Sequence, residues 1–261
     1  MSSEAAKSST GALLPTGAAS GYLRQSRRPL VSLAFVVPLL LLYEGGVVVL
    51  GPNAVRNGAD VWLRQFLDML GFSQYFLLPG LTIALLLAWH HVVRDRWRVS
   101  ALVLYGMFVE CAVWGMLLVG LARIEGMAAH FALGGEPLQQ TSNAVPWAVG
   151  ARGAFLGRML GYVGAGVYEE MLFRLLLLPP VAFCARQLGA RPGVRVAGAI
   201  LLTSLIFSAA HYVGPHGDSL DAFTFFFRFT AGAVFAVLFV YRGFGIAAGS
   251  HALYDIFVSL G

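Results

Sequence analysis

The sequence is short of charge and of cysteine. Charged residues make up only 12% of the 261 residues, about half the fraction usual in soluble domains, while 58% are hydrophobic. A soluble core cannot hide this much apolar surface, but a lipid bilayer accepts it on many helices at once. The two cysteines, Cys111 and Cys184, form no C-x-x-C motif and lie in apolar segments, so we expect two small buried side chains rather than a zinc-finger pattern.

The motifs of several other protein classes are missing too. There is no G-x-S-x-G, no H-E-x-x-H, no serine–lysine pair with a clear partner and no cysteine placed as a nucleophile. The net charge is +5, but no basic face or known motif accompanies it, so we expect no nucleic-acid partner. The basic residues instead form short clusters beside apolar runs, as is typical of membrane proteins.

The sequence does contain a succession of apolar runs. A membrane-spanning helix needs about 20 mostly apolar residues. We therefore predict an all-α fold, a polytopic transmembrane helix bundle of about seven spans whose last four helices hold the functional site. The expected spans are Val31–Leu50, Phe72–Val93, Ser100–Ala122, Ala154–Leu178, Ala197–Tyr212, Ala222–Val240 and Phe244–Leu260.

Three regions follow from this pattern. Residues 1–30 are rich in Ser, Ala and Gly and are expected to be a flexible cytosolic tail. Residues 31–150 are expected to hold N-terminal transmembrane helices and loops, and residues 151–261 to form the core that holds the functional site. Within the second region, Val61–Leu70 is amphipathic, and we expect it to lie flat on the membrane. We expect a long loop at Arg123–Arg152, and we expect Pro179 and Pro180 to end the fourth span.

The distribution of Lys and Arg sets the expected orientation. With the N-terminus inside, the inner segments hold most of the basic residues, and the outer loops hold fewer bases diluted by acids. We therefore predict an integral membrane protein with a cytoplasmic N-terminus and an external C-terminus. The use of Gly, Ala and Arg points to a bacterial plasma (inner) membrane.

Ionisable side chains inside the spans are the candidates for function, because each costs about 3 kcal/mol or more in the bilayer. Glu44 and Glu110 suggest no role beyond pairing with Arg158 or with a neighbouring helix. The full set within the spans is Glu44, Glu110, Arg158, Glu169, Glu170, Arg174, His211, Arg228, His251 and Asp255.

The helical spacing of the acids suggests two different tasks. Glu170 and Arg174 are four residues apart with the acid first, the favourable order for an ion pair on a helix. Glu169 is rotated by about 100° from Glu170, so one carboxylate can be structural while the other meets a different partner. Taken alone, this group fits an ion-pair cluster that fixes helix packing better than it fits a catalytic site.

Two histidines add to this group. His251 and Asp255 lie four residues apart on one face of the last helix, and His211 ends the fifth span. Counting about 1.5 Å of rise per residue places Glu169 and both histidines in one layer near the middle of the membrane. A carboxylate and two imidazoles at one depth can activate water and stabilise an oxyanion, the two needs of peptide hydrolysis.

Three ordered motifs resemble those of the CAAX protease and bacteriocin-processing (CPBP) family, which includes the type II CAAX prenyl proteases. They are Glu169-Glu170-x-x-x-Arg174, Phe207-x-x-x-His211 and His251-x-x-x-Asp255.

The resemblance implies a glutamate-dependent intramembrane endopeptidase without a metal or other cofactor. Glu169 would be the general base assisted by His211, and His251 with Asp255 would stabilise the oxyanion. Glu170 and Arg174 would be the supporting pair. Because some members carry Asn where this chain has Asp255, and an ionised Asp cannot donate a hydrogen bond, Asp255 is either protonated or orients His251; we favour the second role.

Other functions remain open at this point. Glu169, His211 and His251 could instead be the ligands of a zinc metalloprotease. The protein could also be a non-catalytic membrane partner or chaperone, of the bacteriocin-immunity type, or a proton-coupled transporter. The expected partners are the lipid bilayer and a membrane-associated protein. The resemblance permits a prenylated tail, a bacteriocin leader or a C-terminal sorting signal as substrate.

Overall fold

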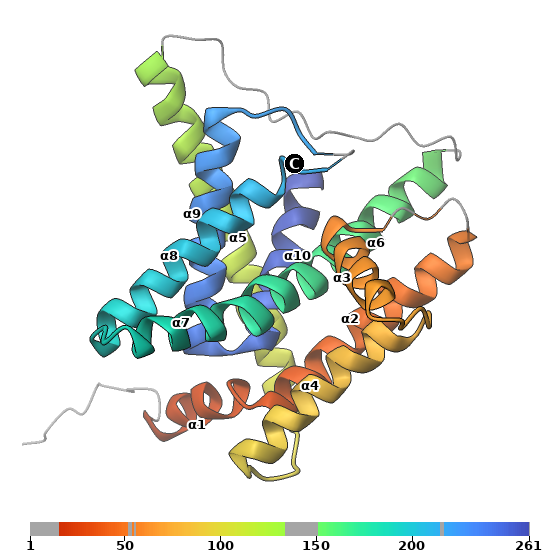
Figure 1. Cartoon of the computed structure of the whole chain (residues 1–261), viewed down its shortest axis with the longest axis vertical. Coiled ribbons are helices and arrows are strands. Elements are labelled where there is room, and N and C mark those ends of the chain that lie inside the picture. The colour runs from red at the N-terminus through yellow and green to blue at the C-terminus, as the bar shows by residue number, and fades with distance from the viewer. Residues whose placement is uncertain (1–15, 52–53, 55, 134–150, 215–216, 261) are drawn as a thin grey trace, which may run out of the picture.

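The computed structural model describes residues 16–51, 54, 56–133, 151–214 and 217–260, and this part of the chain holds helices and no strand (Figure 1). The all-α prediction is confirmed. The elements are α1 (Thr16–Ser26), α2 (Pro29–Leu50), α3 (Gly58–Met69), α4 (Leu77–Val93), α5 (Ala101–Leu133), α6 (Ala151–Glu170), the π-helix η2 (Met171–Leu177), α7 (Leu178–Gln187), α8 (Pro192–Ala210), α9 (Ala222–Arg242) and α10 (Phe244–Leu260).

The helices are those of a polytopic membrane protein. Four of them, α2, α5, α8 and α9, are long and apolar enough to cross a bilayer, and α4 and α10 are shorter apolar helices. Large apolar side chains such as Val49 and Leu102 are about four-fifths exposed on the outside of the bundle, where lipid replaces water as the solvent. Cys184 is exposed as well, so the prediction that both cysteines are buried is correct only for Cys111.

Helix α10 lies at the centre of the bundle and packs against α2, α5, α6 and α9. Small residues permit this close packing: a Cβ atom on Gly166 of α6 would lie 2.6 Å from the carbonyl oxygen of Ala248. The tight turn before α10 depends on Gly243, whose φ of 90° strongly favours glycine. The residues of the first two turns of α10 are all buried by the surrounding helices.

Two predicted helix ends are wrong. Helix α5 continues to Leu133, so the loop predicted from Arg123 begins eleven residues too early; residues 134–150 lie outside the described part. Pro179 and Pro180 do not end the fourth span, because the chain passes through η2 into α7 with the prolines in the first turn of α7. Prolines are tolerated in a first turn, and the wider π-turns directly before them accommodate the change in hydrogen bonding.

The segment before α2 differs from the expected flexible tail, because Thr16–Ser26 form α1. The Tyr22 hydroxyl donates to Glu110 of α5 at 2.5 Å. Arg242, at the end of α9, donates to both oxygens of Glu110 at 2.7 Å. Glu110 thus pairs with Arg242 rather than with Arg158, and together they attach α1 to the bundle.

Basic segments that charge counting assigned to one side of the membrane meet in the structure. Arg28, at the start of α2, donates to the Asp95 carboxylate and to the Arg98 carbonyl in the connection between α4 and α5. Arg27 donates to the carbonyl of Val240 near the end of α9. The predicted division into regions 1–30, 31–150 and 151–261, and the orientation relative to the cytoplasm, stay predictions.

Candidate active site

The two adjacent carboxylates occupy the last positions of α6, where the helix changes its hydrogen-bonding pattern. Glu169 is 8% exposed and Glu170 is fully buried. The π-helix η2 begins at the next residue, Met171. Such π-turns within α-helices are frequent at functional sites. Nothing in the residue spacing indicated this one, although the two following prolines are a signal that the helix cannot continue undisturbed.

His211 comes from the end of α8, where it caps the helix. Its Nδ1 lies 2.8 Å from the Phe207 carbonyl oxygen. A carbonyl oxygen can only accept, so Nδ1 carries the proton. This leaves Nε2 directed at Glu169, whose Oε2 lies 3.8 Å away. The His211 side chain is 26% exposed, so this edge of the site is open.

His251 comes from α10 and is held from two sides. Its Nδ1 lies 2.8 Å from Oε1 of Glu170, and its ring stacks on Phe235 with centroids 4.4 Å apart and planes inclined by 13°. Its Nε2 lies 3.8 Å from Oε2 of Glu169 and 3.7 Å from Oδ2 of Asp255. The imidazole is therefore fixed, and Nε2 is the atom that faces the other acids.

The structure assigns the orientation of His251 to a different acid from the one we expected. The contact from Asp255 is too long for a hydrogen bond, whereas Glu170 makes a short one to Nδ1. The reason is the packing of α6 against α10, which brings Glu170 to Nδ1, while Asp255, one turn along α10, reaches only the far edge of the ring. Asp255 thus lies on the same edge of the imidazole as Glu169.

Glu170 and Arg174 form the expected ion pair, with 3.1 Å between Oε1 and Nη1. Both are buried, and Nη2 of Arg174 also donates to the Gly232 carbonyl of α9 at 3.0 Å. The guanidinium lies over the ring of Phe207, 4.4 Å from its centroid. This pair therefore joins η2 to α8, α9 and α10, and it fixes the carboxylate that orients His251.

Asn57 was missed by the motif comparison. It is the N-cap of α3, and its Nδ2 donates to Oε1 of Glu169 at 2.8 Å. The other oxygen of Glu169, Oε2, has no hydrogen-bond partner among the described residues and faces the two histidines. No pattern in the sequence links Asn57 to a glutamate 112 positions later, so only the three-dimensional arrangement could reveal this contact.

A polar cluster of two buried acids and two half-buried arginines fixes α3 beside the site; we call it the α2–α3 cluster (Glu44, Arg56, Asp60 and Arg64). Arg64 bridges Glu44 at 2.9 Å and Asp60 at 2.6 Å. Arg56 pairs with Asp60 at 2.7 Å. Glu44 therefore has its cation on α3 and not at Arg158. The predicted amphipathic segment Val61–Leu70 lies largely within helix α3, and its Arg64 binds to α2; its position flat on the membrane stays a prediction.

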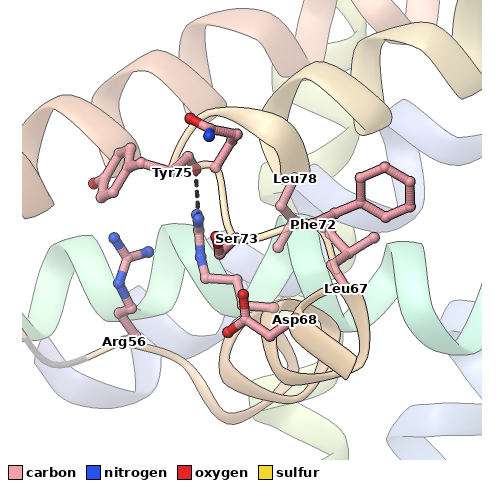
Figure 2. Close-up of a pocket in the computed structure, with 9 residues that line it drawn as sticks. Arg56, Leu67, Asp68, Phe72, Ser73, Tyr75 and Leu78 are labelled. Carbon is pink, nitrogen blue, oxygen red and sulfur yellow. Dashed lines mark hydrogen bonds between the residues drawn. The ribbon is translucent and has the colours of Figure 1, made fainter. Parts of the chain in front are cut away.

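A pocket of about 290 Å³ lies next to this cluster, between α3 and the start of α4. Figure 2 shows its lining, with Arg56 beside Tyr75 and with Leu67, Phe72 and Leu78 on the apolar wall. The guanidinium of Arg64 donates to the Tyr75 carbonyl at 2.5 Å, which closes one side. Glu169 and the two histidines do not line this pocket, so the Glu–His cluster is a separate site.

Metal ligation was one of the alternatives. Within the residues that the structure describes, no group of three or more His, Cys, Asp and Glu side chains is placed to hold a metal ion. The Glu169 oxygen lies at 3.8 Å from both imidazole nitrogens, a spacing at which a bound water can connect polar atoms.

These features define a class: a polytopic helical membrane protein with a buried Glu–His site formed by α6, α8 and α10. Residues 151–257 match the family model described as type II CAAX prenyl endopeptidase, Rce1-like. The matched segment contains all seven residues of the three motifs, and over residues 151–257 the match confirms the recognised resemblance to the CAAX protease family. It also supports peptidase activity. No curated protein and no solved structure matches the chain.

Proposed function

We propose that this protein is an intramembrane endopeptidase in which Glu169 activates a water molecule for attack on a peptide carbonyl. The observation that carries the proposal is the position of Glu169 Oε2, which lies 3.8 Å from Nε2 of both His211 and His251. A water bound to this oxygen is within reach of both rings. The site is thus equipped to move a proton and to meet a developing negative charge.

The reaction follows from these positions. The water oxygen bonds to the carbonyl carbon of the substrate, and Glu169 accepts a proton from that water. His211 assists through Nε2, because its Nδ1–H is donated to the Phe207 carbonyl. The C–N bond then breaks, and the proton held by Glu169 passes to the leaving nitrogen. The products are a carboxylic acid and an amine, and the base is regenerated without another reactant.

His251 is proposed to stabilise the oxyanion. Its Nδ1 proton is engaged with Glu170, so Nε2 donates when the ring carries both protons. Glu169, Glu170 and Asp255 each place a carboxylate oxygen within 3.8 Å of the ring, which supplies the negative charge that balances an imidazolium. We propose that Asp255 helps to balance the positive charge of the His251 imidazolium, and that it does not donate a hydrogen bond to the oxyanion itself.

The substrate is proposed to be a membrane-associated protein. His211 is the most exposed of the proposed catalytic side chains, so a chain segment would enter from its side, near the end of α8. A prenylated tail, a bacteriocin leader and a C-terminal sorting signal all meet this description. The proposed setting is a bacterial inner membrane with the N-terminus in the cytoplasm.

The test compares the termini of membrane proteins in native membranes from cells that express wild type, Glu169→Ala or the control Asp68→Ala at equal levels. Asp68 is an exposed carboxylate of α3. We expect segments removed in the wild type and the control to be retained with Glu169→Ala. If all three give the same termini while deletion of the protein still changes the cells, the catalytic proposal fails and a non-catalytic partner role replaces it. Loss of cleavage by chelation, restored by zinc, would favour the metalloprotease.

A further inference from the structure

We infer that Asn57 is a positioning residue that sets the direction of the Glu169 carboxylate; the inference rests on the proposed function. Asn57 lies outside residues 151–257, the segment that matches the family. Its Nδ2 lies 2.8 Å from Oε1 of Glu169. A residue of the N-terminal half thus contacts the proposed general base.

The hydrogen bonds of Asn57 leave only one orientation for its amide. The backbone N–H of Ala59 donates to Oδ1 at 2.9 Å, which caps α3. Because an N–H group must meet an acceptor, Oδ1 is the end that faces Ala59 and Nδ2 is the end that faces Glu169. The two ends of one side chain therefore have separate tasks, a helix cap and a donor to the base.

The donor determines which carboxylate oxygen is available for chemistry. With Oε1 bound to Asn57, the carboxylate of Glu169 is held so that Oε2 faces His211 and His251. Hydrogen bonds to an ionised acceptor are stronger than those between neutral groups. Without this donor the carboxylate can rotate, and a bound water would lose its fixed position between the two rings.

The α2–α3 cluster holds Asn57 in place. Its backbone N–H donates to the Tyr43 hydroxyl at 3.2 Å, and that hydroxyl donates to Oδ2 of Asp60 at 2.9 Å. Asp60 is fully buried and is paired with Arg56 and Arg64. The buried charges of α2 and α3 therefore have a functional consequence, because they deliver one amide group to the site.

The experiment separates the two tasks of Asn57. Serine caps helices as well as asparagine does, but its side chain is too short to reach Glu169. We expect Asn57→Ser to keep the helix cap and so to melt at a higher temperature than Asn57→Ala, and to lower kcat by about 10- to 100-fold, with KM changed less than about twofold. Asn57→Ala loses the cap as well, so it should show the same loss of kcat together with a lower Tm.

The pH profile supplies a readout that a purely structural role would not move. Loss of a donor to the ionised carboxylate disfavours its charged form, so the acid limb of kcat/KM should move to higher pH. Gln65→Ala, an exposed change on α3, serves as the matched control with an unchanged profile. The other ionisable groups around Glu169 are the same in all these variants: Arg56, Asp60, Glu170, Arg174, His211, His251 and Asp255.

The assay uses the purified full-length protein and a fluorogenic peptide. The peptide contains a peptide bond that the comparison of membrane-protein termini shows to be cleaved in the wild type. If Glu169→Ala is inactive but Asn57→Ser keeps wild-type kcat and acid limb, the assignment of Asn57 is overturned and the proposed function stands. An effect on KM alone would make Asn57 a substrate contact and also overturn it. If Glu169→Ala cleaves normally, the proposed function itself fails.

Discussion

Glu170 connects two buried positive groups, so its removal should be costly. Its carboxylate has no exposed surface, accepts from His251 at 2.8 Å and pairs with Arg174 at 3.1 Å. Glu170→Ala would leave a guanidinium that is 1% exposed without its counter-ion. Breaking a buried pair from one side costs about 3–5 kcal/mol, because the remaining charge stays buried.

This cost converts to a measurable change in thermal unfolding. For a chain of this size, about 1 kcal/mol shifts Tm by about 2–4 °C, so Glu170→Ala should lower Tm by about 6–20 °C. Purified wild type and variant would be compared by circular dichroism in one detergent at one pH. Glu170→Gln should be milder, because its amide oxygen still accepts the Nδ1 proton of His251.

A double variant provides the control. Glu170→Gln with Arg174→Met removes both charges, and a side chain of similar length fills the space of Arg174. It should be more stable than the sum of the two single changes, because no unpaired charge remains. The reasoning is refuted if Glu170→Ala melts within 2 °C of wild type, or if the double variant is no more stable than that sum.

Two further predictions concern the packing of the helices. Gly166→Ala should lower the free energy of unfolding by about 1–3 kcal/mol, because its Cβ would lie 2.6 Å from the Ala248 carbonyl oxygen. The control Gly45→Ala has nothing within 4 Å of its Cβ and should leave the stability unchanged. Equal melting temperatures of the two variants would contradict this account. Glu110→Gln should lower the free energy of unfolding by about 1–3 kcal/mol, because it weakens the pairing with Arg242. Because this pairing attaches α1 to the bundle, trypsin should then cut after Arg24 of α1 faster than in the wild type.

The helices were largely predictable because their signal is local. Helix α10 has the bounds expected from hydropathy, and α9 differs only by two residues at its end. The extension of α5 was missed because Arg123 and Glu125 interrupt the apolar run, although polar side chains do not interrupt helical hydrogen bonding once the chain leaves the apolar layer. Hydropathy finds where lipid contact ends, and this is a different point from the end of a helix.

The site was predictable only as far as motifs reach. Glu169, Glu170, His211, His251 and Asp255 were all chosen from sequence, and the structure brings them together. The pairings were not predictable, because a choice between Glu170 and Asp255 as the partner of His251 depends on how α6 is rotated against α10. The same holds for Glu110 and Arg242, which are 132 positions apart.

The π-helix η2 makes the spacing of the first motif as important as its composition. A π-turn contains one residue more than an α-turn of the same element, and each residue of an α-helix turns the chain by about 100°. Deleting a single leucine from Leu175–Leu177 would keep every polar residue of the motif, yet it would remove the extra residue that the π-turn holds and so change the backbone hydrogen bonding between the two carboxylates and α7. Changes of side chain in this segment alter packing locally, whereas a change of its length alters the backbone geometry that links the two carboxylates to α7.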